Sequence, residues 1–349
     1  MSETEEPTRR VLVFGAGSVG VFVGGKLAAA GAEVTFVGRP WLIEEITAAG
    51  LHLTDLDGGA QDVTPDRFRV ATEPDDVGCA DLVLVTVKSG ATADAARALA
   101  DKIRPGTVVL SLQNGIGNDT VIREILPSCV VLAGMVMFNV VRRHGPGRFH
   151  RGTEGGLAVQ DDPALADHLA LFDRAGLPLR RHADLRPVQW AKLLLNLNNP
   201  VNALSGRTLR EELADRDYRR CLALAQREAL TVMKRARMSP ARLTPLPPAL
   251  MARLLTVPTW LFRAVAGRVL AIDPHARSSM ADDLAAGRRT EITWLCGEIV
   301  DLGAMVGVRA PVNERLIQLI VAAEQGGRRD WPSGELLAEL RAAGSTTRQ

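Results

Sequence analysis

The sequence predicts an α/β fold with a doubly wound parallel sheet in its N-terminal part, followed by an all-α C-terminal domain. Apolar runs alternate with helical stretches up to about Leu185, and the remainder is rich in Leu, Ala and Arg and lacks β-branched runs. A length of 349 residues is sufficient for two domains. We therefore expect one domain over residues 9–184, a second over 185–330 and a frayed tail over 331–349.

The first elements form a βαβ unit. Residues 11–14 and 34–37 are short apolar runs typical of strands buried on both faces, and residues 19–30 between them have a helical pattern. Two strands and a helix within about thirty residues predict parallel strands joined by a right-handed crossover. Further strands are predicted over 82–87, 108–112 and 130–136, and a helix over 91–102. This alternation indicates a doubly wound sheet.

A glycine-rich turn links the first strand to the first helix. Its sequence G-A-G-S-V-G comprises Gly15, Ala16, Gly17, Ser18, Val19 and Gly20. Gly15 permits the tight turn, Gly17 lets the backbone approach a pyrophosphate, and Gly20 lets the helix pack closely on the strand. The pattern alone is weak and could be a structural turn. Its place between a buried strand and a helix predicts a Rossmann domain that binds a dinucleotide at these six residues.

The end of the second strand favours NADPH over NADH. An NAD site places an acidic residue there to hold the ribose hydroxyls, but this chain has Gly38-Arg39-Pro40. The guanidinium of Arg39 suits a 2′-phosphate in charge and bidentate geometry. The nearest acid, Glu33, precedes the strand and is unsuited to this role. The alternative is that Arg39 is an ordinary surface arginine.

Two polar residues follow later strands of the predicted sheet. Lys88 comes after the strand at 82–87, and Asn114 lies in L-Q-N-G-I-G after the strand at 108–112. Both are therefore expected at the carboxyl edge, where doubly wound sheets bind ligands. Lys88 could equally be a surface lysine, and Asn114-Gly115 could be a simple turn.

The segment W-A-K-L-L-L-N-L-N-N-P-V-N-A-L-S-G, residues 190–206, predicts an apolar helix in the second domain. It carries Lys192, Asn196 and Asn199 at positions i, i+4 and i+7, so the three share one face. Burial would lower the pKa of Lys192 toward the range useful for proton transfer. The alternative, of equal weight on these residues alone, is a helix packed by its leucines with a lysine that reaches solvent.

A second polar segment, S-S-M-A-D-D-L-A-A-G-R-R-T-E-I, contains Ser279 and Glu291. On one straight helix these residues would lie about 18 Å apart. They can meet one small ligand only if the chain bends, and Gly287 with Thr290 offers a helix end and a new N-cap. A structural salt bridge is the alternative role for Glu291.

The composition argues against several partners. A net charge of +2 and an aromatic content of 4% do not suggest a nucleic-acid or membrane surface. The charged N-terminus lacks an apolar signal segment. The cysteines at positions 79, 129, 221 and 296 are far apart, which favours reduced thiols over a metal site. We expect a cytoplasmic protein with no nucleic-acid partner, no membrane partner and no metal.

Together these residues resemble the ketopantoate reductase (2-dehydropantoate 2-reductase) family. The resemblance runs from Val11 to about Ala323 and rests on ordered motifs: G-A-G-S-V-G, V-K-S, Q-N-G-I-G, W-A-K-L-L-L-N, S-S-M-x-x-D and R-R-T-E-I. It implies an NADPH-dependent reduction of a small 2-oxo acid to a 2-hydroxy acid. Ketopantoate is the leading substrate and pantothenate biosynthesis the implied pathway.

The resemblance also implies a role for each matched residue. Residues 15–20, Arg39 and Lys88 would hold NADPH, and Asn114 would lie between cofactor and substrate. Lys192 would protonate the 2-oxo oxygen as hydride arrives at C2. The substrate would be bound by Asn196, Asn199 and Ser279, and Glu291 would lie near the nicotinamide and the substrate hydroxyl.

Two features depart from the family pattern. The second asparagine is expected eight positions after the lysine, where this chain has Pro200, so Asn199 or Asn202 takes that role. Residues 246–273 form a longer apolar segment, which could be a homodimer face, a wall of a reshaped pocket or buried packing.

Two other functions remain open. A related dehydrogenase of another branched 2-oxo acid, or of an imine, would keep Lys192 and Asn114. A non-catalytic NADP-binding regulator would use the Rossmann domain as a sensor, but it gives no reason for Lys192, Asn196, Ser279 and Glu291 to occur together.

Overall fold

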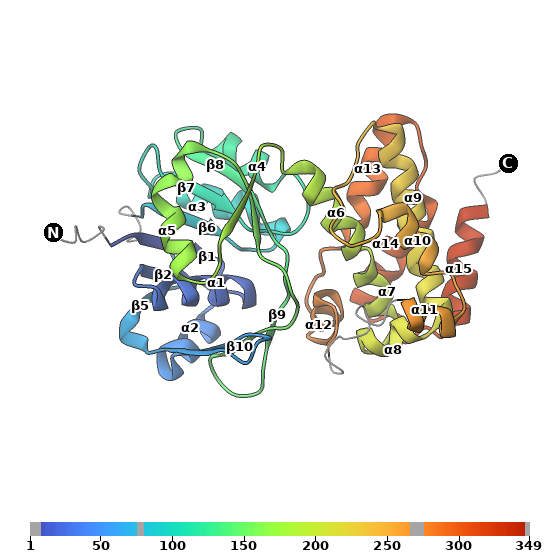
Figure 1. The fold of residues 1–349 in the computed structure, drawn as a ribbon, viewed down its shortest axis with the longest axis horizontal. Helices are drawn as coiled ribbons and strands as arrows, with labels where there is room; N and C mark the ends of the chain where they lie inside the picture. Colours follow the sequence, from blue (N-terminus) through green and yellow to red (C-terminus); the bar gives the residue numbers. More distant parts are fainter. Residues whose placement is uncertain (1–7, 75–79, 266–275, 346–349) are drawn as a thin grey trace. The chain divides into compact units, whose positions relative to one another are not determined.

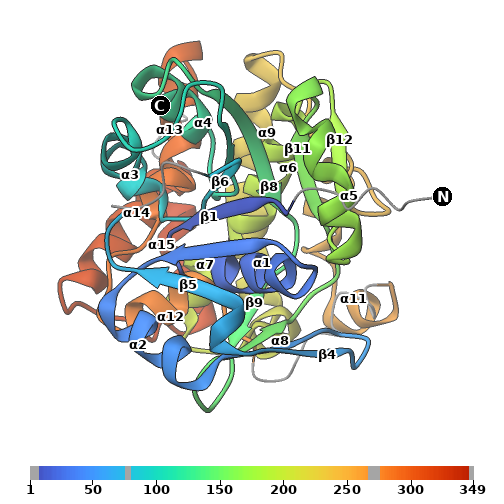
Figure 2. The ribbon, with the colours of Figure 1, turned by 90° about the vertical axis from the view of Figure 1, so that its left-hand side faces the viewer.

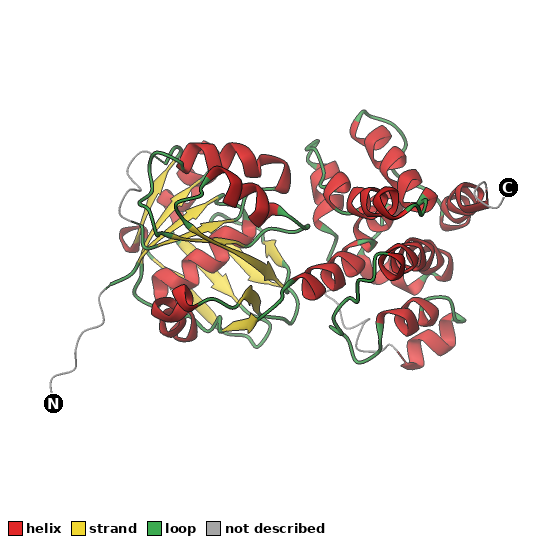
Figure 3. Cartoon of the chain, turned by 90° about the horizontal axis from the view of Figure 1, so that it is seen from above, coloured by secondary structure: helices red, strands yellow, loops and turns green. Residues whose placement is uncertain are grey.

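The computed structural model describes residues 8–74, 80–265 and 276–345. The chain divides into two compact units, Met1–Leu185 and Arg186–Gln349 (Figure 1). Strands occur in the first unit, whereas the described part of the second is helical (Figure 3). This confirms the predicted fold class.

An eight-stranded sheet with the order β12-β11-β8-β7-β6-β1-β2-β5 forms the centre of the first unit. Its strands are β1 (Arg10–Phe14), β2 (Glu33–Val37), β5 (Phe68–Ala71), β6 (Leu82–Val85), β7 (Val108–Ser111), β8 (Val130–Val136), β11 (Leu157–Gln160) and β12 (Leu179–His182). Six neighbouring strands, β8, β7, β6, β1, β2 and β5, are parallel to one another. Strand β11 pairs with β8 in the antiparallel direction. Figure 2 shows β1, β2 and β5 side by side.

Helices cover both faces of this sheet because its central strands are apolar on both sides. Val11 and Val13 belong to one buried cluster with residues of α1 (Ser18–Ala29) and α5 (Ala166–Arg174). Leu12, between them, belongs to a second cluster with residues of α3 (Thr92–Leu99) and α4 (Asn118–Ile125). Successive side chains of a strand point to opposite faces, so each face has its own core.

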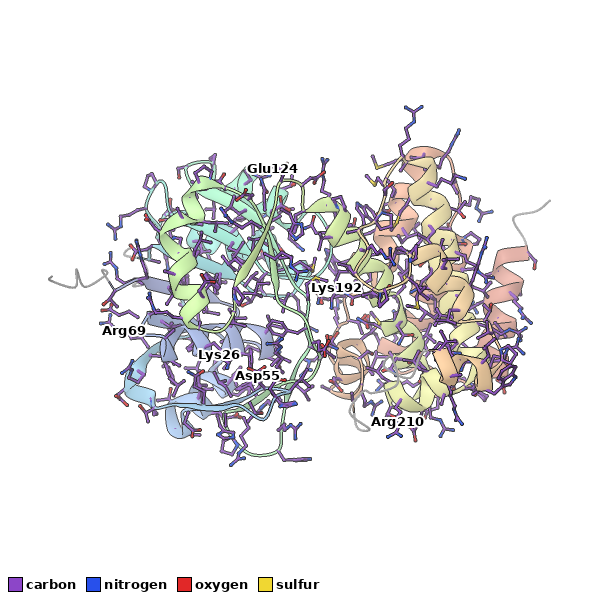
Figure 4. All side chains as sticks on the ribbon, viewed as in Figure 1. Lys26, Asp55, Arg69, Glu124, Lys192 and Arg210 are labelled. Carbon is purple, nitrogen blue, oxygen red and sulfur yellow. The ribbon has the colours of Figure 1, made fainter. Side chains whose placement is uncertain are left out.

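A second sheet, with the order β4-β3-β10-β9, was not predicted. It comprises β3 (Leu51–Thr54), β4 (Ala60–Val63), β9 (Val140–Arg142) and β10 (Arg148–Arg151), and α2 (Pro40–Ala49) precedes it. Leu51 and Leu53 are buried while their neighbours are partly exposed. Lys26 of α1 forms an ion pair with Asp55, which follows β3, at 3.0 Å (Figure 4). Such short alternating strands give a weak signal in sequence.

The second unit is a helical assembly around the 20-residue helix α9 (Arg216–Arg235). The other helices are α6 (Arg186–Asn196), α7 (Asn198–Ser205), α8 (Leu209–Ala214), α10 (Pro248–Leu254), α11 (Thr259–Val265), α12 (Ser279–Ala285), α13 (Cys296–Val306), α14 (Pro311–Glu324) and α15 (Ser333–Ser345). No helix in the described ranges is long and apolar enough to cross a bilayer.

The expectation of a frayed C-terminal tail is wrong. Residues 333–345 form α15, which packs against α9. Leu336, Leu337 and Leu340 are buried, because their spacing places them on one face of the helix. The hydroxyl of Tyr218 in α9 donates to the carbonyl of Trp331 at 2.6 Å and fixes the approach to α15. Gly326, Gly327 and Gly344 favoured a frayed end, but the buried leucine face of the helix stabilises it although Gly344 lies within it.

The apolar segment at 246–273 packs in part against the body of the unit. Ala252, Leu255 and Phe262 of its described part are buried. The guanidinium of Arg219 in α9 is fully buried, donates to the carbonyls of Leu213, Leu255 and Val257, and lies 4.3 Å from the Phe262 ring centroid. This arginine therefore anchors the connection between α10 and α11. Residues 266–275 lie outside the described residues.

Candidate active site

The glycine turn has the geometry expected of a dinucleotide-binding loop. Gly15 has φ +109°, a conformation that side chains rarely adopt, and a Cβ there would lie 2.5 Å from the backbone nitrogen of Val87. A Cβ on Gly20 would lie 2.5 Å from the Gly15 carbonyl oxygen and 2.5 Å from Thr86 Oγ1. A Cβ on Gly17 would meet only the Gly15 oxygen, at 3.9 Å. Gly15 and Gly20 thus keep the turn compact, and the absence of a side chain at Gly17 leaves open space beside the backbone.

The other residues of the motif continue from this turn into α1. The N–H groups of Gly15 and Ala16 both donate to the Val37 carbonyl at 2.9 Å, which joins the turn to the end of β2. Gly17 precedes the helix, and Ser18 and Val19 form its first positions. The first N–H groups of a helix lack intrahelical acceptors and can bind an anion.

Arg39 lies directly beyond the end of β2. It occupies the N-cap position of α2, and its side chain is exposed. Gly38 N–H donates to the Ala71 carbonyl, which fixes this corner against β5. Glu33 lies at the opposite, amino end of β2, so it is unable to contact a ribose at the carboxyl edge. Arg39 is therefore the charged residue at the position where an NAD site has an acid.

Lys88 and Asn114 lie in two loops that hydrogen bonds hold together. The Ser89 hydroxyl donates to the Asn114 carbonyl at 2.8 Å, and Gln113 Nε2 donates to the Val87 carbonyl at 3.1 Å. Thr86 Oγ1 in turn donates to the Gly15 carbonyl at 2.7 Å. The glycine turn, the Lys88 loop and the Asn114 loop are thus adjacent at the carboxyl edge of the sheet, as the sequence predicted.

A buried polar network that sequence reasoning missed supports these loops. Asn118 Nδ2 donates to the Asn114 carbonyl at 2.7 Å, and Thr92 Oγ1 donates to Asn118 Oδ1 at 2.9 Å. Gln113 Nε2 donates to Thr92 Oγ1 at 2.7 Å. Ser89, Thr92, Gln113 and Asn118 are all buried, so their polar groups depend on one another. The signal in sequence was that Ser89 and Gln113 belong to the V-K-S and Q-N-G motifs and that Thr92 and Asn118 follow each motif by three residues.

In the second unit, Lys192 lies in α6 (Figure 4). Its side chain is half-buried, and burial lowers the pKa of its ammonium to about 8. In the described part of the chain the ammonium has no acidic or carbonyl partner. Asn196, one turn further along, is also half-buried. An unpaired ammonium with a lowered pKa is suited to bind an oxyanion and transfer a proton.

The prediction of one continuous helix over residues 190–206 is wrong. The helix breaks at Leu197, between α6 and α7. Pro200 has no N–H to donate to the Asn196 carbonyl, and its ring would crowd that oxygen in a straight helix. Because of this break, helical spacing no longer implies that Asn199 shares a face with Lys192 and Asn196.

Asn199 and Asn202 have different environments in α7. Asn202 is fully buried, and its amide is committed: Nδ2 donates to the Arg207 carbonyl and to Glu212 Oε2, and Oδ1 accepts from Ser278 N–H. Asn199 is half-buried, and its side-chain amide has no partner among the described residues. Asn199 is therefore the one of the two that is available to a ligand.

The structure brings Asn199 close to the start of α12. Ser278 Oγ donates to the Asn199 carbonyl at 3.3 Å and accepts from Ala281 N–H, which caps the helix. Ser279, the next residue, is exposed at the first helical position. The expected bend before Glu291 is also present. Gly287 has φ +64° after α12, and Thr290 Oγ1 accepts from Ile292 N–H. Glu291 follows as a half-buried residue.

The fold and these residues define the class of Rossmann-type oxidoreductases with a helical second domain. The model of the family described as "Ketopantoate reductase PanE/ApbA" matches residues 11–163, and that of its C-terminal part matches residues 184–324. The chain belongs to the ketopantoate reductase family.

Individual relatives agree with this membership. The 2-dehydropantoate 2-reductase of Halobacterium salinarum is 32% identical over 326 residues, which cover 91% of this chain and 100% of the relative. A crystal structure of a PanE/ApbA family ketopantoate reductase from Ralstonia eutropha has a TM-score of 0.77 at 30% identity, covering 91% of this chain and 99% of that one. D-mandelate dehydrogenase, solved with NADH and anilino(oxo)acetate, has a TM-score of 0.73 at 20% identity, with 91% and 99% covered, and shares the fold.

Proposed function

We propose that this protein reduces 2-dehydropantoate to pantoate with NADPH. Membership of the ketopantoate reductase family over both units supports the reaction. The structural observation that carries the proposal is the ammonium of Lys192, which has no partner among the residues that the structure describes and whose pKa is lowered to about 8 by burial. Addition of a hydride equivalent to C2 turns the oxo oxygen into an alkoxide. An ammonium beside that oxygen stabilises the charge and then donates the proton that completes the hydroxyl group.

The residues at the carboxyl edge of the sheet fit NADPH. Gly17 has room for a pyrophosphate, Arg39 is positioned for a 2′-phosphate, and no acid occupies the end of β2. We assign the cofactor to residues 15–20, Arg39 and Lys88, with Asn114 reaching both ligands. When bound, the dihydronicotinamide supplies the hydride equivalent, and the protein supplies orientation and charge.

We assign the substrate to residues of the second unit. Asn196, Asn199 and Ser279 would bind its carboxylate and hydroxyl groups, since each offers hydrogen-bonding groups to a small polar acid. Glu291 would lie near the nicotinamide and the substrate hydroxyl. The proton that Lys192 gives to the product is regained from water before the next turnover.

We also propose that the enzyme is a cytoplasmic homodimer. Cys221 and Cys296 are buried free thiols, which suit a reducing compartment. Trp260 and Val265 of α11 are 71% and 58% exposed, and this surface is the one we assign to self-association. Analytical ultracentrifugation of the parent protein and of Trp260→Ser tests this assignment. We expect the parent to sediment as a dimer and the variant as a monomer, and a dimeric variant would contradict the assignment.

The test of the function is NADPH oxidation, followed by absorbance, with 2-dehydropantoate and a panel of other branched 2-oxo acids and imines. We expect 2-dehydropantoate to have the highest kcat/KM. A higher value for another oxo acid would assign the protein to a related dehydrogenase. NADPH binding without turnover of any member of the panel would favour a regulator.

A further inference from the structure

A buried carboxyl group lies behind the residues that we assign to the substrate. Glu212 in α8 is 0% exposed. Its Oε2 accepts hydrogen bonds from Asn198 Nδ2 at 3.1 Å and from Asn202 Nδ2 at 3.0 Å. No cation pairs with this carboxyl group within the described ranges of the chain. A carboxylate so placed would carry an uncompensated buried charge, which is strongly unfavourable.

Two unpaired acceptors suggest how this charge is avoided. Glu212 Oε1 and Asn198 Oδ1 are both buried, and neither has a hydrogen-bond donor in the described structure. They belong to side chains already joined by the bond from Asn198 Nδ2 to Glu212 Oε2. A proton on Oε1 would let the carboxylic acid donate to Asn198 Oδ1 and form a reciprocal acid–amide pair. One proton thus satisfies both atoms, and burial independently raises the pKa of Glu212 to about 8.

Hydrogen bonds connect Glu212 to the starts of α7 and α12, the two segments that carry Asn199 and Ser279. Asn198 precedes Asn199 at the start of α7. Asn202 Oδ1 accepts from the N–H of Ser278 at 2.9 Å, and Ser278 precedes Ser279 at the start of α12. One carboxyl group therefore connects the beginnings of two helices that are 81 residues apart in sequence (198 to 279).

We propose that Glu212, held as a neutral acid, is a positioning residue that sets Asn199 and Ser279 relative to each other for binding of the oxo acid. This inference rests on the proposed function. Glu212 does not itself touch the substrate, because it is fully buried behind Asn198 and Asn202. It acts through these two amides.

Three variants test the proposal. Glu212→Ala removes both hydrogen bonds, whereas Glu212→Gln keeps an acceptor for Asn202 and gains an N–H for Asn198 Oδ1. The matched control is Asp215→Ala. It also removes two hydrogen bonds, which Asp215 accepts from Asp217 N–H and from Ser333 Oγ directly after α8.

We expect Glu212→Ala to raise the KM for the oxo acid by about tenfold, with kcat and NADPH affinity changed by less than about threefold, since about 1.4 kcal/mol of substrate binding corresponds to tenfold. Glu212→Gln should restore the parent KM. The control should lower the Tm without changing KM. Either a parent-like KM in Glu212→Ala or failure of Glu212→Gln to restore it overturns the proposal. If Glu212→Ala does not fold, Asn202→Ala, which cuts the link to Ser278, must show the same rise in KM.

Hydrogen–deuterium exchange separates this inference from the proposed function. In Glu212→Ala the amide of Ser278 should exchange about tenfold faster than in the parent, and Glu212→Gln should restore its protection. This measurement does not depend on turnover. A parent that reduces no oxo acid would refute the function, while unchanged protection of Ser278 in Glu212→Ala would refute the positioning role.

Discussion

Asn202 Oδ1 accepts a hydrogen bond from the backbone N–H of Ser278 at 2.9 Å and so joins α7 to α12 across 76 residues of sequence. This bond decides between the two asparagines that follow Lys192. The Asn202 amide is committed within the protein, whereas the Asn199 side-chain amide has no partner among the described residues and is available to a ligand. A break in the helix at Leu197, caused by Pro200, accompanies this division of roles.

Asn199→Ala should therefore raise the KM for the oxo acid by about tenfold and leave the Tm unchanged, because one charge-assisted hydrogen bond to the substrate is lost and none within the protein. Steady-state kinetics and thermal unfolding together check this. A lowered Tm with an unaltered KM would mean that the side chain is structural.

Lys192→Ala should lower kcat by at least about a hundredfold at nearly unchanged NADPH affinity, the low end for loss of a general acid. Stopped-flow binding and steady-state rates measure the two effects separately. Full activity in this variant would remove Lys192 from the mechanism.

The pH dependence of the parent should reflect the pKa of about 8 that burial gives Lys192. Reduction needs the protonated amine, so kcat/KM should be flat below this pH and fall as pH rises through it. Oxidation of the hydroxy acid needs the neutral amine and should show the opposite trend. Loss of the inflection in Lys192→Ala would identify the group, and its persistence would assign it to another residue.

Arg39→Asp should weaken NADPH binding and shift the preference toward NADH, because a carboxylate repels the 2′-phosphate and suits the ribose hydroxyls. Arg67→Asp is a matched control, since Arg67 is an exposed arginine of the same unit near the amino end of β5. Fluorescence titration with both cofactors measures the ratio of affinities. An unshifted ratio would mean that the 2′-phosphate is recognised elsewhere.

Substitution of two glycines of the turn should affect different properties: stability for Gly20 and NADPH binding for Gly17. Gly20→Ala places a methyl group 2.5 Å from the Gly15 carbonyl and should lower the free energy of unfolding by about 1–3 kcal/mol, as overpacking does. Gly17→Ala meets nothing closer than 3.9 Å and should keep the parent Tm while weakening NADPH binding. Calorimetry and cofactor titration distinguish these outcomes. A stable Gly20→Ala variant would contradict the close packing of α1 on β1.

Leu340→Ala should destabilise the second unit by about 2–5 kcal/mol, because this side chain is fully buried between α15 and its neighbours. The control Arg341→Ala changes the adjacent exposed residue. Thermal unfolding followed by circular dichroism checks the difference. Equal melting temperatures would restore the view of residues 331–349 as a tail.

The local sequence pattern determined the fold of the first unit and the positions of several site residues within it. The doubly wound sheet, the glycine turn at residues 15–20 and the places of Lys88 and Asn114 at the carboxyl edge follow from apolar runs and the residues that end them. These features depend on neighbours in sequence and on the rule that parallel strands end at one edge. The prediction of a frayed tail over residues 331–349 failed because the leucine face of α15 becomes stable only when it packs against α9 and α14.

Tertiary structure alone decided which polar groups have hydrogen-bond partners within the protein and which are left for a ligand. The buried Gln113–Thr92–Asn118 network and the hydrogen bond from Ser278 to Asn202 join distant segments of the chain. The burial that lowers the pKa of Lys192 is likewise a result of folding. A hydrogen bond depends on distance and direction between two groups, and burial determines how much an unpaired one costs. Sequence spacing fixes neither quantity for residues that meet only after folding.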